Sequence, residues 1–181
     1  SALESLGGTP GSIVKLDESA SRESILDSIE LLADSLQESV NTVFVLMMVG
    51  HGNADSSTWR FNVTGPDLTT EDLVAALNAV PAARQLIVLA TSASGATLDT
   101  LEQPGRVVVT ATKSGGEINA VRFPEYLAEA MSSTVADYDR NEILTIAEAF
   151  RFAATRTGEF YDQQKLLASE HSRLRGDDAG D

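Results

Sequence analysis

Two short segments of the sequence carry residues that could transfer an acyl group. His51 stands between Gly50 and Gly52, and glycine on both sides allows a sharp turn that leaves the imidazole open to a ligand. Ser92 follows a second apolar run and precedes Gly95. A hydroxyl beside a histidine is a nucleophile with its general base, and nearby backbone N–H groups can stabilise the oxyanion that forms. The two segments together predict acyl-transfer chemistry.

Each segment alone also has an ordinary structural interpretation. A single histidine in a surface loop is more often held by a backbone hydrogen bond than used in catalysis, and residues 91–95 read as a Ser/Thr-rich connection between a strand and a helix. The joint occurrence of both features at the ends of two apolar runs favours the functional interpretation.

Three apolar runs are predicted to position these residues. Residues 42–49, 85–90 and 106–111 are continuous in Val, Leu, Ile and similar side chains, which is typical of strands buried on both faces of a parallel sheet. In such sheets, sites form at the carboxyl ends of the strands. His51 and Ser92 come directly after two of these ends, so we expect them at one edge of the sheet.

Amphipathic segments alternate with the apolar runs. Apolar residues recur at helical spacing over 21–40, and shorter helices are predicted over 73–80 and 125–131 and a long one over 144–167. Thr69 and Asp72 have the spacing of a capping box. Short strands are predicted at 13–16 and, solvent-exposed, at 59–63. This alternation predicts an α/β domain with a mostly parallel central sheet flanked by helices.

Length, composition and charge predict one domain and exclude several classes of function. The chain has 181 residues, 43% of them apolar, which predicts one domain over 1–181 with a flexible lead-in at 1–11 and a loose acidic tail at 173–181. A net charge of −14 argues against nucleic acid as a partner, because a phosphate binder needs a basic face. No apolar run reaches the ~20 residues of a membrane span. The absence of cysteine excludes disulfides, thiolate metal sites and a cysteine nucleophile.

The two strand ends resemble those of the caspase and legumain clan of peptidases. The pattern of that clan is an apolar strand ending in His-Gly, followed by an apolar strand ending in Asp-x-Cys-x-Ser-Gly. The corresponding stretches here are residues 48–52 and 90–95. They agree with the pattern at His51, Gly52, Ser94 and Gly95 and depart from it at Ala90, in place of the acid, and Ser92, in place of the cysteine.

The resemblance extends to the bacterial legumain-like branch through residues 106–117, 136–150 and the tail around 170–171. It implies a three-layer caspase-like (haemoglobinase) fold that binds a peptide or protein and requires no cofactor, and it favours a secreted or periplasmic bacterial location. The implied site is His51 as general base, Ser92 at the nucleophile position, Gly52 and Ala93 as backbone oxyanion donors, and Lys113, Ser114 and Glu117 in the substrate-pocket loop.

Serine at position 92 lowers the expected activity by orders of magnitude, because a hydroxyl needs a strong, oriented base where a thiol does not. Three origins of Ser92 stay open: an engineered trap, a natural pseudopeptidase, or a serine peptidase. The Ser/Thr-rich surroundings favour a natural substitution over an engineered one. A non-catalytic protein-interaction module is a competing function, and an unrelated doubly wound domain that binds a small ligand or a metal is another.

A second cluster has the spacing of a calcium loop. Asp137, Asp139, Asn141 and Glu148 occupy positions 1, 3, 5 and 12 of an EF-hand-like loop. Glu142 replaces the glycine that this loop uses for its turn, which predicts backbone strain there. Alternatively, Glu148 completes a capping box with Thr145 at the start of a helix. Calcium is the one metal that the sequence suggests.

Overall fold

A central sheet of four strands organises the computed structural model, which describes residues 13–36, 42–55 and 58–176. The strands are β1 (Val43–Gly50), β5 (Arg84–Thr91), β6 (Arg106–Thr110) and β7 (Arg173–Arg175), in the order β1-β5-β6-β7. The first three are parallel to one another, whereas β7 is antiparallel to β6. The prediction of an α/β fold with a mostly parallel sheet is confirmed.

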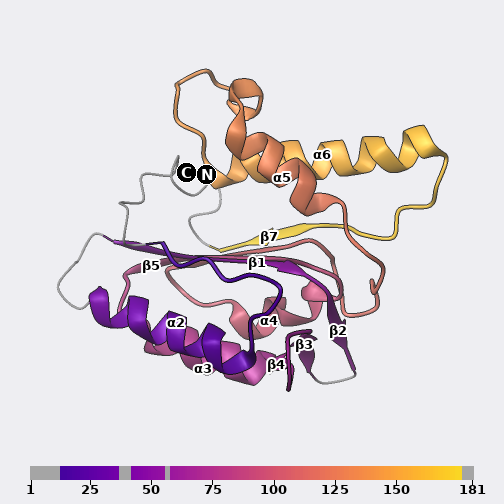
Figure 1. Ribbon diagram of the computed structural model, residues 1–181. Helices are drawn as coiled ribbons and strands as arrows, with labels where there is room; N and C mark the ends of the chain where they lie inside the picture. Colours follow the sequence, from indigo (N-terminus) through magenta and orange to yellow (C-terminus); the bar gives the residue numbers. More distant parts are fainter. Residues whose placement is uncertain (1–12, 37–41, 56–57, 177–181) are drawn as a thin grey trace.

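Helices cover both faces of this sheet (Figure 1). On one face lie α2 (Arg22–Ser35), α3 (Thr70–Ala79) and the short α4 (Leu98–Leu101), which follows the 3₁₀ turn η1 (Ser94–Thr97). On the other lie α5 (Phe123–Ser132) and α6 (Ile146–Gln164), with the 3₁₀ turn η2 (Thr134–Ala136) between them in sequence. None of the helices in the described part of the chain has the length and apolarity needed to cross a bilayer.

A small antiparallel sheet lies beyond the carboxyl end of β1. Its strands are β2 (Gly52–Ala54), β3 (Trp59–Phe61) and β4 (Leu68–Thr69). Because β2 begins two residues after β1 ends, the chain turns at His51 from the large sheet into the small one. That turn brings the small sheet next to the edge where the predicted site lies.

The position of β5, with helices on both faces of the sheet, explains why its sequence is apolar without interruption. Ile87 and Leu89 belong to the core shared with α2 and α3, while Val88 and Ala90 belong to the core shared with α5 and α6. Successive side chains of a strand point to opposite faces, so both sets are buried. Such a strand has no solvated face on which polar residues would alternate.

Local capping signals define where the helices begin. Ser21 caps α2, and Thr69 caps α3 in a capping box with Asp72, as predicted from the spacing. The Asp72 carboxylate also accepts hydrogen bonds from Arg22, at 2.8 Å from Nε. Chiefly because of these bonds, the pKa of Asp72 lies well below its usual range. The pair ties α2 to α3.

Three predictions about the shorter elements are corrected by the structure. Residues 13–16 form no strand. Residues 59–61 do form a strand, but Trp59 is fully buried instead of exposed, because its indole packs beneath the turn that follows β5. The prediction of a loose tail is wrong for residues 173–175, because they form β7 and pair with β6. The predicted lead-in at 1–11 and the end at 177–181 lie outside the described residues.

Candidate functional site

The two sequence segments with predicted chemistry lie side by side at one edge of the sheet. In the parallel pair of β1 and β5, Gly50 is in register with Thr91, so His51 and Ser92 are the next residues of the two neighbouring strands. This is the carboxyl edge, where an α/β sheet places its binding residues. The two segments are joined by hydrogen bonds between Ser92 and Gly52, the residue after the histidine.

The Ser92 hydroxyl is held by both backbone groups of Gly52. Its oxygen donates to the Gly52 carbonyl at 3.0 Å and accepts from the Gly52 N–H at 3.2 Å, and the residue is only 2% exposed. Among the described residues, no hydrogen bond joins the His51 ring to this hydroxyl. The proton that a general base would remove is therefore directed at a carbonyl oxygen.

Gly52 permits this arrangement because it has no side chain. A Cβ there would lie 2.6 Å from the Trp59 indole nitrogen and 2.7 Å from the Ser92 carbonyl oxygen, closer than real Cβ contacts come. The Trp59 indole N–H donates to that same carbonyl at 3.3 Å. Trp59 thus fixes the backbone of Ser92 from the small sheet, a role that the alternating sequence of β3 did not reveal.

The backbone N–H of Ala93 is already engaged. Ala93 is fully buried in the left-handed region, with φ 57° and ψ 5°, a conformation that costs a non-glycine residue about 1 kcal/mol or more. Its N–H donates to the Glu117 carbonyl at 2.8 Å. The Gly52 N–H meets the Ser92 hydroxyl, so both N–H groups predicted to stabilise an oxyanion have partners within the protein.

Buried hydroxyls and close backbone contact complete the turn after β5. Ser94 donates to the Thr91 carbonyl at 2.8 Å, and Thr112 accepts from the Gly95 N–H at 2.9 Å. A Cβ on Gly95 would lie 2.1 Å from the backbone nitrogen of Ser114. The loop predicted to form a substrate pocket therefore packs directly on this turn.

Glu117 is the centre of that loop. Its carboxylate accepts from the backbone N–H groups of Lys113 at 2.8 Å and His171 at 3.1 Å, and it pairs with the imidazole Nδ1 of His171. Burial raises the pKa of Glu117, but these bonds outweigh it, so the net shift is downward. The Ser114 hydroxyl accepts from the Gly116 N–H and so stabilises the turn of the loop.

Glu170, next to His171 in the sequence, holds the segment after α6 against the start of α5. Its carboxylate, 3% exposed, accepts from the backbone N–H groups of Arg122 at 2.7 Å and Phe123 at 3.1 Å, and so caps the start of α5. The Tyr161 hydroxyl donates to it at 3.0 Å, and burial raises the pKa of that tyrosine. The sequence resemblance marked residues 170–171, but not what they contact.

The chain matches no model of a protein family and no curated protein.

The acidic loop brings three of its four predicted oxygen donors together. One carboxylate oxygen each from Asp137, Asp139 and Glu148 lie within 4.8 Å of one another. The Asn141 side-chain oxygen accepts from the backbone N–H of Ile143 at 2.7 Å, so it is engaged inside the loop. Calcium binding by this loop stays a prediction.

Two structural expectations about the same loop are confirmed. Glu142 has a φ of 65°, which is the left-handed conformation expected where the loop would use glycine. Thr145 and Glu148 form a capping box at the start of α6, and hydrogen bonds from Thr145 hold the pKa of Glu148 below its ordinary value. Glu148 therefore serves the helix whether or not a metal binds.

Proposed function

We propose that this chain is a caspase- and legumain-like α/β domain that recognises a peptide at the ends of β1 and β5 without hydrolysing it at a significant rate. In this proposal, His51 and Ser92 occupy the positions of the histidine and the nucleophile of a peptidase dyad. The observation that carries the proposal is the paired hydrogen bonding of Ser92 with Gly52.

The arrangement of the strands supports the peptidase-like part of the proposal. Two neighbouring parallel strands deliver an imidazole and a hydroxyl at their carboxyl ends, and helices lie on both faces of the sheet. His51 is exposed, so it is accessible to a ligand. These features are compatible with a three-layer caspase-like fold.

The surroundings of Ser92 support the loss of hydrolysis. An alcohol becomes a nucleophile when a base takes its proton in the transition state. Here the Ser92 hydroxyl donates its proton in a hydrogen bond to the Gly52 carbonyl. The N–H groups of Gly52 and Ala93, which could stabilise an oxyanion, donate to the Ser92 hydroxyl and to the Glu117 carbonyl. Attack on a peptide would require breaking several buried hydrogen bonds at once, each of which costs about 1–3 kcal/mol when left unpaired.

The experiment compares four folded forms of the protein: wild type, Ser92→Ala, Ser92→Cys, and Ser92→Cys combined with His51→Ala. Each is incubated with a library of fluorogenic peptides and with peptides that carry a thiol-directed electrophile. We expect the wild type to match Ser92→Ala in hydrolysis. Ser92→Cys should be labelled by a subset of the peptides, and removing His51 should slow that labelling by about 100-fold, the usual contribution of a positioned base.

Two results would contradict the proposal. Hydrolysis by the wild type that disappears in Ser92→Ala would identify an active serine peptidase. Labelling of Ser92→Cys at the rate of a free thiol, with no effect of His51→Ala and no preference among peptides, would separate the site from those of peptidases altogether. The peptide that labels best is then tested, without its electrophile, as a reversible ligand of the wild type.

A further inference from the structure

The strand β1 stands at an edge of the sheet although its composition is that of an interior strand. Its eight residues carry no charge, and Val43 and Val49 are 49% and 62% exposed. Edge strands in stable proteins are usually short, charged or covered, because their unpaired backbone groups attract other strands. The opposite edge follows that rule, since β7 is three residues long and reads Arg-Leu-Arg.

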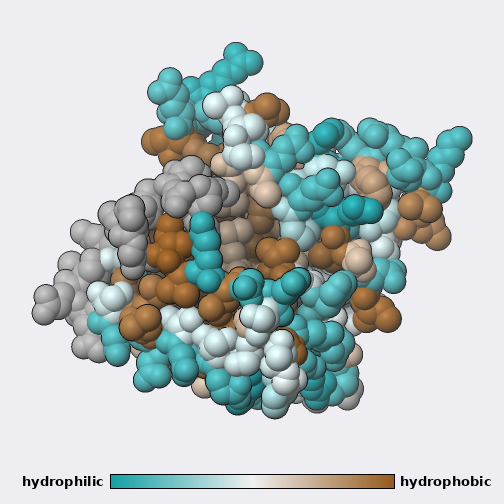
Figure 2. Space-filling view, in the orientation of Figure 1, coloured by the Kyte–Doolittle hydropathy of each residue, from teal (hydrophilic) through white to brown (hydrophobic). Residues whose placement is uncertain are grey.

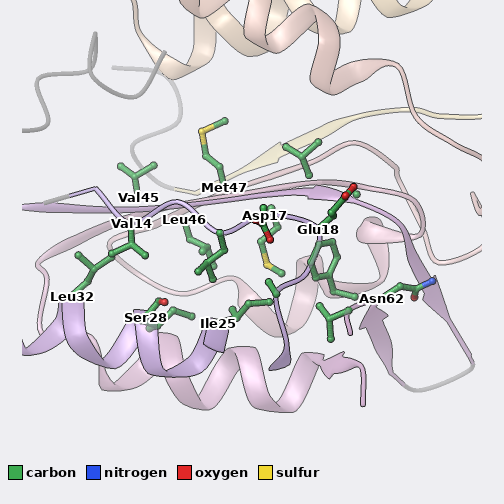
Figure 3. A pocket seen from close by; sticks show the side chains of 18 of the residues that line it. Val14, Asp17, Glu18, Ile25, Ser28, Leu32, Val45, Leu46, Met47 and Asn62 are labelled. Atoms are coloured by element: carbon green, nitrogen blue, oxygen red, sulfur yellow. The ribbon is translucent and has the colours of Figure 1, made fainter. Parts of the chain in front are cut away.

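A slot runs along the open side of β1 (Figure 3). It has a volume of about 520 Å³ and extends from Val14 to His51. Besides β1, it is lined by α2, with Ile25 and Leu32, and by the segment before α2, with Val14 and Leu16. Figure 2 shows hydrophobic residues gathered over this part of the molecule, where β1 and α2 lie in Figure 1.

The slot presents side chains from both faces of β1. Val45 and Met47 point away from α2, and Leu46 points toward it (Figure 3). A strand laid beside β1 would also send its side chains to both faces in turn. Those on one face would meet α2, and those on the other would extend the surface of Val45 and Met47.

The backbone along this slot is unpaired within the described part of the chain. The described backbone bonds of the segment 13–20 do not reach β1: Ala20 donates to Asp17, and Thr64 donates to Ala20. β1 is bonded to β5 on one side only, so alternate N–H and C=O groups face the slot. They form a template for one further strand.

The charge around the slot indicates what kind of strand it takes. Asp17 and Glu18 are the acidic residues among the described residues that line it, which include no lysine or arginine, and the whole chain carries a net charge of −14. A second copy of β1 would bring two strongly acidic molecules together. A strand flanked by lysine or arginine would instead meet opposite charge, which favours encounter and binding.

We propose that β1 is the acceptor of a strand from a partner polypeptide, an extended segment with alternating apolar side chains and basic flanks. The partner adds as a fifth strand beside β1 and fills the slot above α2. Main-chain hydrogen bonds supply affinity in this mode of recognition, and the pockets between side chains supply specificity. The proposal concerns a surface that adjoins the Ser92 site but does not depend on the chemistry of that site.

The test uses a short synthetic peptide, KKVTVTVKK, and three variants of it. One variant has N-methylated amides at alternate residues, so that it cannot form the ladder; one has EE in place of KK at both ends; and one is a scrambled sequence. Binding is measured by fluorescence anisotropy, and hydrogen–deuterium exchange maps the amides that become protected. We expect the parent peptide to bind and to protect residues 43–50, and the other three to bind at least about tenfold more weakly.

Two protein variants provide a matched control. Val49→Lys places a charge on the edge of β1, and Leu31→Lys places the same charge on α2 outside the slot; the two wild-type residues are 62% and 66% exposed. We expect Val49→Lys to weaken binding of the peptide by at least about tenfold, because an edge lysine blocks strand addition. Leu31→Lys should bind as the wild type does.

Three outcomes would overturn the proposal. They are equal binding of the parent and N-methylated peptides, protection outside residues 43–50, and equal effects of the two lysine variants. Sedimentation of the wild type adds a fourth: a dimer that Val49→Lys dissolves and Leu31→Lys preserves would make a second copy of the chain the occupant. Since Ser92→Cys labelling does not report on this edge, failure here leaves the proposed function untouched.

Discussion

The turn after β5 and the outer edge of β1 lie next to each other and differ in how their polar groups are satisfied. The hydroxyls of Ser92 and Ser94 in the turn, and that of Thr112, which follows β6 and contacts the turn, are all bonded within the protein. Along β1, half of the backbone groups face a slot. A group that already has a partner adds stability but little reactivity, whereas an unpaired group can still bind. Within the described residues, the turn therefore contributes stability, and the edge of β1 offers backbone groups without a strand partner.

The largest expected effect comes from opening the turn. Gly95→Ala places a Cβ 2.1 Å from the backbone of Ser114, so the loop must move, and we expect a loss of about 3 kcal/mol in the free energy of unfolding. Gly158→Ala in α6 is the control, because its Cβ would meet nothing within 4 Å. It should stabilise the helix by about 0.5–1 kcal/mol. Denaturant unfolding of both variants measures the difference, and equal effects would mean that the turn is not tightly packed.

Removing one hydroxyl tests the same turn more gently. Ser92→Ala leaves the buried N–H and C=O of Gly52 without their partner, which should cost about 2 kcal/mol. Ser132→Ala on the exposed side of α5 removes a hydroxyl bonded to the same helix and should change stability by less than about 0.5 kcal/mol. Thermal melting distinguishes the two. A Ser92→Ala variant as stable as the wild type would contradict a stabilising role of the hydroxyl.

The helix α2, which lines the slot, is joined to α3 by the ion pair between Arg22 and Asp72. The folded-state pKa of Asp72 lies below its unfolded value, so its stabilising contribution is present above about pH 4 and is lost as the pH falls below that. Asp72→Asn should lower stability at pH 7 by about 1–2 kcal/mol and flatten the acid limb of the stability curve. Asp27→Asn, on the exposed side of α2, serves as control. An unchanged acid limb in Asp72→Asn would contradict the assignment.

The smallest effect is expected at the acidic loop, which is remote in sequence from both regions. A calcium site with a Kd near 1 mM would raise stability by only about 0.4 kcal/mol at 1 mM calcium. The melting temperature in calcium and in chelator is compared for the wild type and for Asp137→Asn combined with Asp139→Asn. A shift that the double variant abolishes supports a metal site, and no shift in the wild type removes the hypothesis.

Much of the fold follows from local signals in the sequence. The spacing of Thr69 and Asp72 predicts a capping box before the helix expected over 73–80, and α3 begins directly after that cap, at Thr70. β1, β5 and β6 were predicted from uninterrupted apolar runs, which only a doubly covered sheet can bury. That the ends of β1 and β5 lie together follows from the parallel sheet.

The remaining features depend on contacts between distant segments. The strand β7 has three residues, of which only Leu174 is apolar, so its pairing with β6 defines it. The burial of Trp59 depends on its packing beneath the turn after β5, where its indole N–H donates to the carbonyl of Ser92, 33 residues away. The bond between Ser92 and Gly52 likewise could not be predicted, because the spacing of residues does not say which way a hydroxyl points.

One consequence of the burial of Trp59 is practical. It is the chain's single tryptophan, it is fully shielded, and its indole N–H is bonded to the backbone of Ser92. All intrinsic indole emission from this protein therefore arises beneath the proposed peptide-binding residues. A red shift in that emission on adding a peptide would signal water entering behind Ser92, so a label-free spectrum can follow the opening of the turn in real time.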